Sequence, residues 1–411
     1  MKLIVDENLL SFKVLEQKIF DYVCELGRQI TQQILEAYDT ELAESRDKKH
    51  YRGKGKRKTC IKTVYGEVEY KRAVYRTKTE QGENAYVYLL DEAMQMDKIG
   101  LISTNLAEKI AMTVTESPYR VTAETISNTC GQSISSGGVW NMMQRLGERL
   151  DEEEQYAVKE MDGIWLHMQD SSHKRMKKQE MKVFTMYEGW DKDQQRRSTL
   201  VGKTMLAGME TSRLFHEKRE ALIEKKYDVD EIQQRILNGD GGSWIKETYD
   251  PDAIFQLDRY HVYQEILRKI SDRNAQREAR NLFEEGKTEK LLEFLLVYAD
   301  SVETTDEKDK RSRNARELYR YLNNNKVGLL PYQKQGKKIP EPGEGIVYKN
   351  MGVQESQNCT VITMRMKHRR MRWSIKGASN MAKVLCCKEN KELCHTIEKY
   401  TDGLIFNARM N

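Results

Sequence analysis

The stretch 235–245, Arg-Ile-Leu-Asn-Gly-Asp-Gly-Gly-Ser-Trp-Ile, places one carboxylate between glycines directly after a short apolar run. Arg235 to Gly239 has the length and apolar character of a buried strand, and Ala253 to Leu257 follows as a second one. Asp240 therefore ends a predicted strand. The glycines on both sides lack a Cβ atom and would leave space around its side chain. We expect this stretch to form one edge of an α/β domain.

Further strands precede Asp240. The pattern of apolar and β-branched residues predicts three strands and then a helix over Leu214 to Tyr227. The predicted strands are Gly163 to Met168, Lys182 to Tyr187 and Thr199 to Leu206. Three consecutive strands, a helix and then two more strands is the order of a ribonuclease-H-like mixed sheet. The predicted fold class is α/β.

The chain beyond the last strand has helical character. No proline occurs between Pro251 and Pro331, and apolar residues recur at helical spacing. A Pro- and Gly-rich segment, Pro331 to Gly345, then predicts a loop. We interpret residues 263–345 as a helical insertion. It would separate the two parts of a catalytic core, residues 151–262 and 346–411.

Residues 1–150 form a different, mainly helical region in this interpretation. Leu9 to Glu44 predicts one or two amphipathic helices, and Thr59 to Tyr75 predicts a β-hairpin that turns at Tyr65-Gly66. Val121 to Cys130 and Gly138 to Leu150 predict two helices joined by a tight turn. This pair is either a DNA-reading helix-turn-helix or an ordinary helical pair. The apolar residues of the first helix are Val14, Ile19, Phe20, Val23, Leu26, Ile30 and Ile34.

Two cationic segments are candidate DNA-binding surfaces. In the first, Lys48 to Lys58, glycines disfavour helix, so we expect a mobile arm that contacts a phosphate backbone. Its candidate residues are Arg52, Lys54, Lys56, Arg57 and Lys58. The second, on a predicted helix, contributes Arg365, Lys367, Arg369, Arg370 and Arg372. A solvated helix face is the less favoured interpretation there, because no acidic residue occurs from Arg365 to Lys388.

Two further acidic residues stand at positions comparable to that of Asp240. Asp162 lies at the edge of the first predicted strand, and Glu355 opens a segment that we place on a helix packed against the sheet. Phosphodiester cleavage puts negative charge on the attacking and leaving oxygens, and two Mg²⁺ ions about 3.5 to 4 Å apart stabilise both. Carboxylate oxygens are the ligands that Mg²⁺ requires. Asp162, Asp240 and Glu355 are therefore the candidate ligands for two Mg²⁺ or Mn²⁺ ions.

Each of these carboxylates has an ordinary alternative. The chain has 64 Asp and Glu residues, and an isolated Asp is most often a solvated charge or a helix cap. Gly-Asp-Gly is also a common turn. The joint placement on the first strand, the fourth strand and a late helix, with a basic segment after it, favours the catalytic interpretation.

Several strings resemble the ISLre-type transposases of bacterial insertion sequences, long catalogued as an uncharacterised protein family. They are Glu160 to Gly163, Gly239 to Ile245, Leu257 to His261, and Gly352 to Ser356 with the basic segment that ends at Trp373-Ser374. A more distant resemblance is to the Mutator-like group, whose Asp-x-x-His pattern matches Asp258 and His261. The resemblance implies that Asp162, Asp240 and Glu355 are the catalytic triad and that DNA ends are the substrate.

Three more residues near Asp240 are candidate site residues. Asp258 and His261 would position the metal ligands or the DNA, or else form a buried pair that holds the insertion to the sheet. Trp244 would stack on an unpaired base, an interaction worth about 1 to 3 kcal/mol, or else fill the core.

The composition is that of a polar globular protein. Its 69 Lys and Arg against 64 Asp and Glu give a net charge of +5, so local patches matter more than the total. No stretch approaches the about 18 uncharged apolar residues that cross a bilayer, and acidic residues occur too early for a signal peptide. We expect a cytoplasmic, nucleoid-associated protein. Seven cysteines without a C-x-x-C pair disfavour a zinc site or a disulfide framework.

The leading hypothesis is an insertion-sequence transposase that binds terminal inverted repeats in double-stranded DNA and then cleaves and transfers strands. One alternative is a related nuclease or resolvase that cuts without joining. Another is a domesticated DNA-binding regulator that no longer cuts. Transposition requires two DNA ends to be held together, so the mechanism leads us to expect a homo-oligomer.

Overall fold

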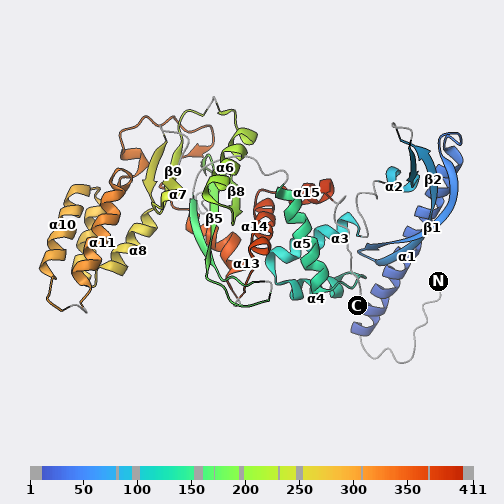
Figure 1. The fold of residues 1–411 in the computed structure, drawn as a ribbon, viewed down its shortest axis with the longest axis horizontal. Coiled ribbons are helices and arrows are strands. Elements are labelled where there is room, and N and C mark those ends of the chain that lie inside the picture. The colour runs from blue at the N-terminus through green and yellow to red at the C-terminus, as the bar shows by residue number, and fades with distance from the viewer. Residues whose placement is uncertain are drawn as a thin grey trace. The chain divides into compact units, whose positions relative to one another are not determined.

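A computed structural model describes residues 12–79, 83–94, 102–151, 161–170, 172–193, 199–229, 232–246, 253–306, 309–368 and 371–400 (Figure 1). The chain folds into two compact units. Unit one is Met1–Glu152 with Lys391–Asn411, and unit two is Glu153–Asn390. Within the ranges given above, no helix is both long and apolar enough to cross a membrane.

A long β-hairpin and a long helix form the first part of unit one. Strand β1 (Arg52–Thr63) pairs antiparallel with β2 (Gly66–Lys78), and β3 (Asn84–Val87) pairs with the far end of β2. Helix α1 (Phe12–Ser45) lies along β2, and the short α2 (Leu89–Ala93) packs beside both. The predicted hairpin is confirmed. Its core with the helices consists of Leu35, Ile61, Val68, Tyr70 and Leu90.

Two carboxylates of α1 fix the helix to the hairpin. Glu36 Oε1 accepts a hydrogen bond from the N–H of Lys71, and Asp39 Oδ1 accepts one from the N–H of Ala73, both at 2.9 Å. Strand β3 pairs only with Tyr75 to Lys78 of β2, so it does not cover the edge of β2 at Lys71 and Ala73. The helix therefore satisfies backbone donors that would otherwise form an open strand edge.

The cationic run is not the mobile arm that we expected, because it forms the first half of the hairpin. β1 begins at Arg52, and Lys56, Arg57 and Lys58 pair with residues of β2. The register shifts between Gly53 and Lys56, which accommodates Gly55 at a φ of 91°. Glycine and lysine have low strand propensity, so the pairing with β2 overrides the local preference of this segment.

Helix α1 is a single helix, as predicted in outline, but its buried face is not the predicted one. Its buried residues are Cys24, Leu35 and Asp39. Most of the apolar residues that we expected to be buried are exposed, namely Val14, Ile19, Val23, Leu26, Ile30 and Ile34. The hairpin therefore covers only one face of a helix that is apolar on two.

Four shorter helices complete unit one. They are α3 (Thr104–Glu116), α4 (Tyr119–Thr129), α5 (Ser136–Asp151) and α15 (Leu393–Tyr400). The predicted helical pair is present as α4 and α5, which pack on each other. Helix α15 packs against α3 and α5 although it comes from the other end of the chain. The buried residues here include Leu106, Ile110, Met142, Leu146 and Ile397.

Unit two combines small β-sheets with helices, so the predicted α/β class is confirmed. Strand β5 (Gln179–Met186) lies between β4 (Met161–Leu166) and β8 (Thr204–Gly208), antiparallel to both. Strands β9 (Ile236–Gly239) and β10 (Ile254–Leu257) pair in parallel. Strand β9 also lies against β4. Four of them fall within or close to predicted strands. The predicted strand Thr199 to Leu206 is instead divided by a turn at Gly202, which has a φ of 65°, and only its second half belongs to β8.

A smaller sheet and several helices surround these strands. The sheet has the order β11 (Ile346–Val347), β6 (Gly189–Asp191), β7 (Leu200–Val201). Helices α6 (Ser212–Lys226) and α7 (Ser243–Lys246) contribute to the sheet core, and α14 (Ile375–Glu389) packs against β8. The core residues are Phe184, Met186, Leu206, Phe215, Ile223, Leu237 and Ile245.

A group of helices follows β10, in the region that the sequence assigned to a helical insertion. It consists of α8 (Arg259–Lys269), α9 (Arg273–Glu284), α10 (Thr288–Ser301) and α11 (Arg311–Asn324), followed by the 3₁₀ turns η3 (Lys326–Leu329) and η4 (Tyr332–Lys334). Asp258 and Asp272 cap α8 and α9 with their side chains. The insertion has its own apolar core, which includes Val262, Ile266, Leu291, Leu295, Leu318 and Leu322.

Candidate active site

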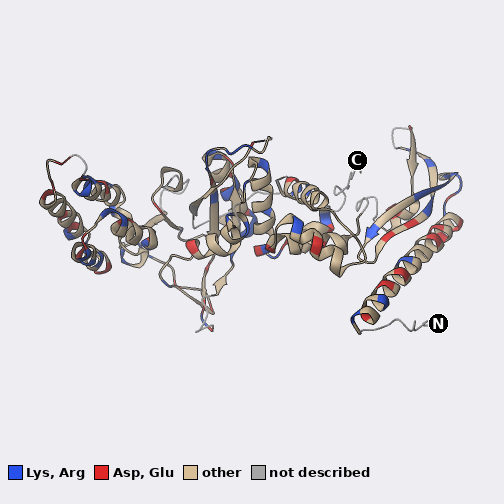
Figure 2. Cartoon of the chain, turned by 90° about the horizontal axis from the view of Figure 1, so that it is seen from below, with Lys and Arg blue, Asp and Glu red and all other residues tan. Residues whose placement is uncertain are grey.

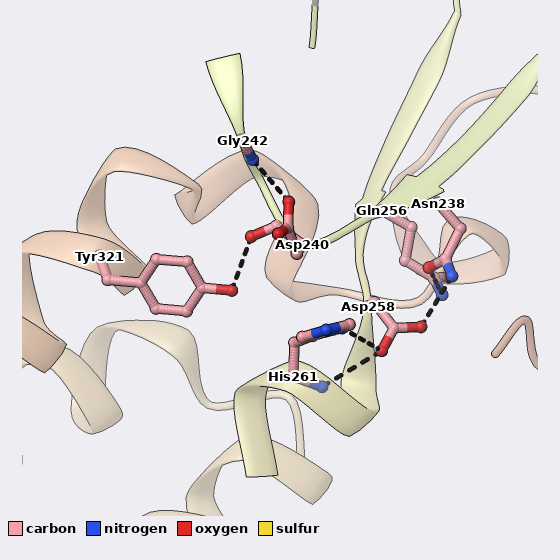
Figure 3. A network of polar contacts seen from close by, with 7 residues as sticks. All are labelled: Asn238, Asp240, Gly242, Gln256, Asp258, His261 and Tyr321. Atoms are coloured by element: carbon pink, nitrogen blue, oxygen red, sulfur yellow. Dashed lines mark hydrogen bonds and ion pairs between the residues drawn. The ribbon is translucent and has the colours of Figure 1, made fainter. Parts of the chain in front are cut away.

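Asp240 directly follows β9, and its backbone turn is fixed by its neighbours (Figure 3). Its Oδ1 accepts a hydrogen bond of 2.8 Å from the N–H of Gly242. Gly241 has a φ of 86°, and a Cβ atom there would meet the Asn325 side chain at 2.6 Å. Only glycine fits this position without strain. Gly241 therefore shapes the turn that presents Asp240, whereas from the sequence we expected the glycines to leave space around the side chain.

The helical insertion supports this turn from the other side. The Tyr321 hydroxyl of α11 donates a hydrogen bond of 2.8 Å to the carbonyl oxygen of Asp240. Asn325 Nδ2 donates to the carbonyl oxygen of Tyr321, also at 2.8 Å. Burial raises the pKa of Tyr321, and the nearby Asp240 carboxylate adds to the shift. The hydroxyl is therefore a neutral, permanent donor that ties the insertion to the sheet edge.

Asp258 is a buried carboxylate at the end of β10, beside Asp240. Its Oδ2 accepts a hydrogen bond of 2.8 Å from Asn238 Nδ2, and its Oδ1 lies 3.1 Å from His261 Nδ1. Burial alone would raise the pKa of Asp258, but the hydrogen bonds from His261 and Asn238 outweigh it and hold the pKa below its usual value. The carboxylate is therefore ionised and acts only as an acceptor, so His261 Nδ1 carries a proton.

Gln256 extends this network into the sheet. Its Nε2 donates to Asn238 Oδ1 at 3.2 Å, and its Oε1 accepts a hydrogen bond of 2.9 Å from the N–H of Tyr332. Asn238 and Gln256 sit side by side on the paired strands β9 and β10, and both are buried. Gln256 thus fixes the amide of Asn238, and Asn238 in turn orients the carboxylate of Asp258 (Figure 3).

Glu355 lies on a short helix, α12 (Gln354–Gln357), that continues as the π-helical segment η5 (Asn358–Thr363) and α13 (Met364–Met366). The helix packs against β4 and β5, as the sequence predicted. The side chain of Glu355 is exposed. At Gly352, just before this helix, a Cβ atom would lie 3.9 Å from Asp258 Oδ2. The segment that leads to Glu355 therefore passes beside the Asp258 network.

The first candidate carboxylate, Asp162, belongs to β4, where its backbone pairs with Val183. Its side chain lies outside the described residues. Strand β4 lies against both β9 and α12, so the three elements that carry or precede Asp162, Asp240 and Glu355 meet around β4. Among the side chains that the structure describes, no group of three or more His, Cys, Asp or Glu residues forms a metal site. The set of three carboxylates nevertheless fits Mg²⁺, which takes hard oxygen ligands.

Trp244 packs into the core of unit two. It is partly buried and meets the Phe215 ring edge to face, with ring centroids 6.0 Å apart. Lys182 Nζ lies 5.6 Å from the centre of its ring. The sequence left two roles open for Trp244. Its contacts with Phe215 and the core of unit two support the core-filling role.

The second cationic segment differs from its prediction. Arg365 is only 5% exposed, and its guanidinium lies 5.6 Å from the centre of the Trp373 ring. It therefore packs inside unit two and cannot contact a DNA backbone. Lys367 and Arg372 are exposed, whereas Arg369 and Arg370 lie outside the described residues.

Lys and Arg residues of the hairpin lie along β1, and acidic residues lie on α1 (Figure 2). Some of these hairpin cations are exposed, and others form ion pairs. Arg52, Lys54 and Arg57 are exposed. Lys56 Nζ lies 3.0 Å from Asp39, which is only 1% exposed, and Lys58 Nζ lies 2.6 Å from Glu69. Lys56 therefore neutralises a buried carboxylate, a structural role that its place in a basic run did not indicate.

One positioning residue was missed from the sequence. Lys203, in the turn between β7 and β8, donates to Gln357 Oε1 of α12 at 2.7 Å and to Glu389 Oε2 of α14 at 2.6 Å. It thus holds the helix of Glu355 to the rest of unit two. No local signal marks such a lysine, because its partners are more than 150 positions away in the chain.

These features define a two-unit α/β protein with a cationic hairpin in one unit and a buried polar network beside Asp240 in the other. The chain belongs to the uncharacterised protein family UPF0236, which matches residues 5–399. It is similar to UPF0236 proteins of Caldanaerobacter subterraneus subsp. tengcongensis. One of them, whose name joins eleven gene designations beginning with TTE0033, is 24% identical over 398 residues, which cover 93% of this chain and 79% of the relative. Another, UPF0236 protein TTE2489, is 24% identical over 390 residues, which cover 91% and 78%.

Proposed function

We propose that this protein is an insertion-sequence transposase that cleaves and joins DNA strands at Asp162, Asp240 and Glu355. The observation that carries the proposal is the meeting of three elements around β4. Strand β4 bears Asp162, and it lies against β9, which ends at Asp240, and against α12, which bears Glu355. Three acidic residues that are far apart in the sequence thus belong to neighbouring elements.

The strand arrangement supports a ribonuclease-H-like sheet. Strands β8, β5 and β4 form an antiparallel sheet in that order, β9 lies beside β4, and β10 pairs in parallel with β9. The spatial order of the five strands is therefore β8, β5, β4, β9, β10. A ribonuclease-H-like sheet, in which three consecutive strands are followed by a helix and then by two parallel strands, is expected to have this order.

The proposed roles of the residues follow from their contacts. When bound by the three carboxylates, two Mg²⁺ ions would stabilise the charge that develops on the attacking and leaving oxygens. Gly242 and Tyr321 hold Asp240 in place from two sides. Asp258 fixes the start of α8 by capping it and lies beside the backbone at Gly352. It therefore positions the turn of Asp240 relative to the segment of Glu355.

Double-stranded DNA is the proposed substrate and partner. The exposed cations Arg52, Lys54 and Arg57 on the hairpin would contact phosphates, and the packed helices α4 and α5 would act as a helix-turn-helix. Lys367 and Arg372 would contact DNA near the carboxylates. The relatives support a mobile element, because a name that joins many gene designations from one genome indicates a sequence present there in many copies.

The first test is the variant Asp240→Asn, assayed on duplex DNA that contains the sequences flanking the gene. With Mg²⁺, we expect the variant to cleave at least about a hundredfold more slowly, because a metal ligand is lost. Binding to the same DNA should stay within about twofold, since phosphate contacts dominate affinity. Asp193→Asn is the matched control, because Asp193 is an exposed carboxylate of the same unit. Unchanged cleavage by Asp240→Asn would refute the proposed site.

A second assay separates the transposase from its alternatives. Cleaved ends with a free 3′-hydroxyl are incubated with the protein, Mg²⁺ and a supercoiled target plasmid. A transposase joins them to the plasmid. A nuclease or resolvase cuts without joining, and a DNA-binding regulator does neither.

A further inference from the structure

Helix α1 carries an exposed apolar stripe on the face opposite to the hairpin side. Its members are Ile19, Val23, Leu26, Ile30 and Ile34, and their exposed fractions are 47, 51, 42, 46 and 58%. At about 100° per residue these five side chains fall within an arc of roughly 80°. The buried residues Cys24 and Leu35 lie about 120° and 140° from the centre of the stripe. An exposed apolar patch of this kind marks an interaction surface.

The four outer members of the stripe are symmetric along the helix. Ile19 and Ile34 are equally far from the point between Leu26 and Gly27, and so are Val23 and Ile30. These four positions therefore have the same spacing when the direction of the helix is reversed, and Leu26 lies half a residue from the centre. Gly27 itself faces the hairpin, because a Cβ atom there would lie 2.8 Å from the Tyr65 ring. Leu26 alone occupies the centre of the exposed stripe.

A pattern that matches its own reverse is what a two-fold contact between identical helices requires, since residue i then meets residue j and j meets i. We propose that α1 packs antiparallel against α1 of a second copy of this chain through this stripe. Ile19 would face Ile34, Val23 would face Ile30, and the two Leu26 side chains would meet at the two-fold axis. The stripe spans about 22 Å, the length of fifteen residues of helix.

The charges of α1 favour the antiparallel direction. Apart from Asp39, which Lys56 neutralises, the last ten residues carry Glu36, Glu41 and Glu44 and no Lys or Arg, whereas the first turns carry Lys13 and Lys18 beside Glu16 and Asp21. A parallel pair would bring the two acidic ends together. An antiparallel pair separates them and sets each beside a neutral end that contains lysines, and it also opposes the two helix dipoles.

Light scattering of the full chain after gel filtration tests the contact without DNA or added metal, so the result does not depend on the proposed activity. We expect the mass of a dimer at micromolar concentration. Ile30→Glu should weaken the dimer at least about a hundredfold, because the two-fold axis repeats the change and a charge then faces Val23 of the other copy in each of two apolar contacts. Val14→Glu is the matched control, since Val14 is 43% exposed on the same helix but off the stripe. It should change the dissociation constant by less than about twofold.

Cysteine pairing tests the direction. In a background with the exposed Cys359 and Cys394 changed to serine, Leu26→Cys should form a disulfide-linked dimer on mild oxidation. Ile19→Cys should link to Ile34→Cys when chains of two sizes are mixed, but not to itself. A monomeric wild type, a dimer that survives Ile30→Glu, or self-linking of Ile19→Cys would each overturn the proposal.

Discussion

At the scale of single residues, the site depends on one buried charge. Asp258 is 5% exposed, accepts hydrogen bonds from Asn238 and His261, and caps α8. A buried carboxylate is stable only when its acceptor positions are filled. Asn238 and Gln256 are buried amides in a short sheet, where apolar residues usually stand. We conclude that these amides are present to hold Asp258.

Asp258→Asn should lower the free energy of unfolding by about 2 kcal/mol at pH 7, because charged hydrogen bonds to a buried carboxylate are lost. The folded-state pKa of Asp258 lies below the ordinary value of 3.8. The stabilisation is therefore complete above about pH 4 and is lost as the pH falls through the folded-state pKa. Urea unfolding at pH 7 and pH 3.5 measures it, and the difference between wild type and variant should shrink at the lower pH.

Asp272→Asn is the matched control for this variant. Asp272 caps α9 in the same way but is exposed, and asparagine is an equally good cap. Its effect should be within about 0.5 kcal/mol at both pH values. A difference for Asp258→Asn that grows on acidification would contradict the assignment of an ionised carboxylate.

The sequence predicted the positions of single residues better than their environments. Asp240, Asp258 and His261 were found because glycines and strand ends mark them locally. Lys56 and Arg365 were assigned to DNA binding because they stand in basic runs, yet one neutralises buried Asp39 and the other packs on Trp373. Burial of a charge depends on partners that are distant in the chain, so neighbouring residues do not reveal it.

At the scale of elements, α12 is held in place by Lys203. Lys203→Met should slow cleavage about tenfold, as expected when a residue that orients a metal ligand is lost. Binding of DNA should not change, because Lys203 is bonded to Gln357 and Glu389. Single-turnover cleavage and affinity measured side by side test this. Lys192→Met, at an exposed lysine, is the control, and equal losses of affinity and rate would argue for a DNA contact instead.

The hairpin gives a prediction that separates its two kinds of cation. Replacing Lys54 and Arg57 together by glutamine should weaken binding to all duplexes and lower the log-log salt slope by nearly two, since each lost phosphate contact removes about 0.9. Lys56→Gln should instead lower the free energy of unfolding by about 1 to 2 kcal/mol, because Asp39 stays buried without its partner. Salt titrations of DNA binding and urea unfolding of both variants decide between the roles. A Lys56→Gln variant of full stability with weakened DNA binding would reverse our assignment.

Strands and helices with a clear period were predicted within a few residues, and the exceptions have physical causes. The five central strands of unit two and the insertion helices follow apolar patterns that their own residues determine. β1 was missed before Thr59 because its glycines and lysines disfavour a strand until β2 pairs with them. The buried face of α1 was misassigned because the helix has two apolar faces, and only the hairpin decides which one it covers.

At the scale of the whole molecule, the chain crosses between its units twice. Unit one contains α15, which packs on α3 and α5 after the entire second unit has been traversed. From the sequence we placed residues 346–411 in the catalytic core, whereas Lys391–Asn411 belongs to unit one. The unit that a C-terminal helix joins depends on contacts with residues far away in the chain, which periodicity does not reveal. The helical core of unit one is therefore completed only by the last part of the sequence.

The substitution Ile397→Ala tests whether α15 completes the helical core of unit one. Ile397 is fully buried, and removing its side chain should lower the free energy of unfolding of unit one by about 2 to 5 kcal/mol, the cost of a core cavity. Hydrogen exchange followed by mass spectrometry should then show faster exchange in α3 and α5 and unchanged exchange in β5 and β8. Val327→Ala is the control, because Val327 is 81% exposed and its loss should alter neither unit. Faster exchange in β5 and β8 would mean that α15 stabilises unit two, and the division of the chain into these two units would then be wrong.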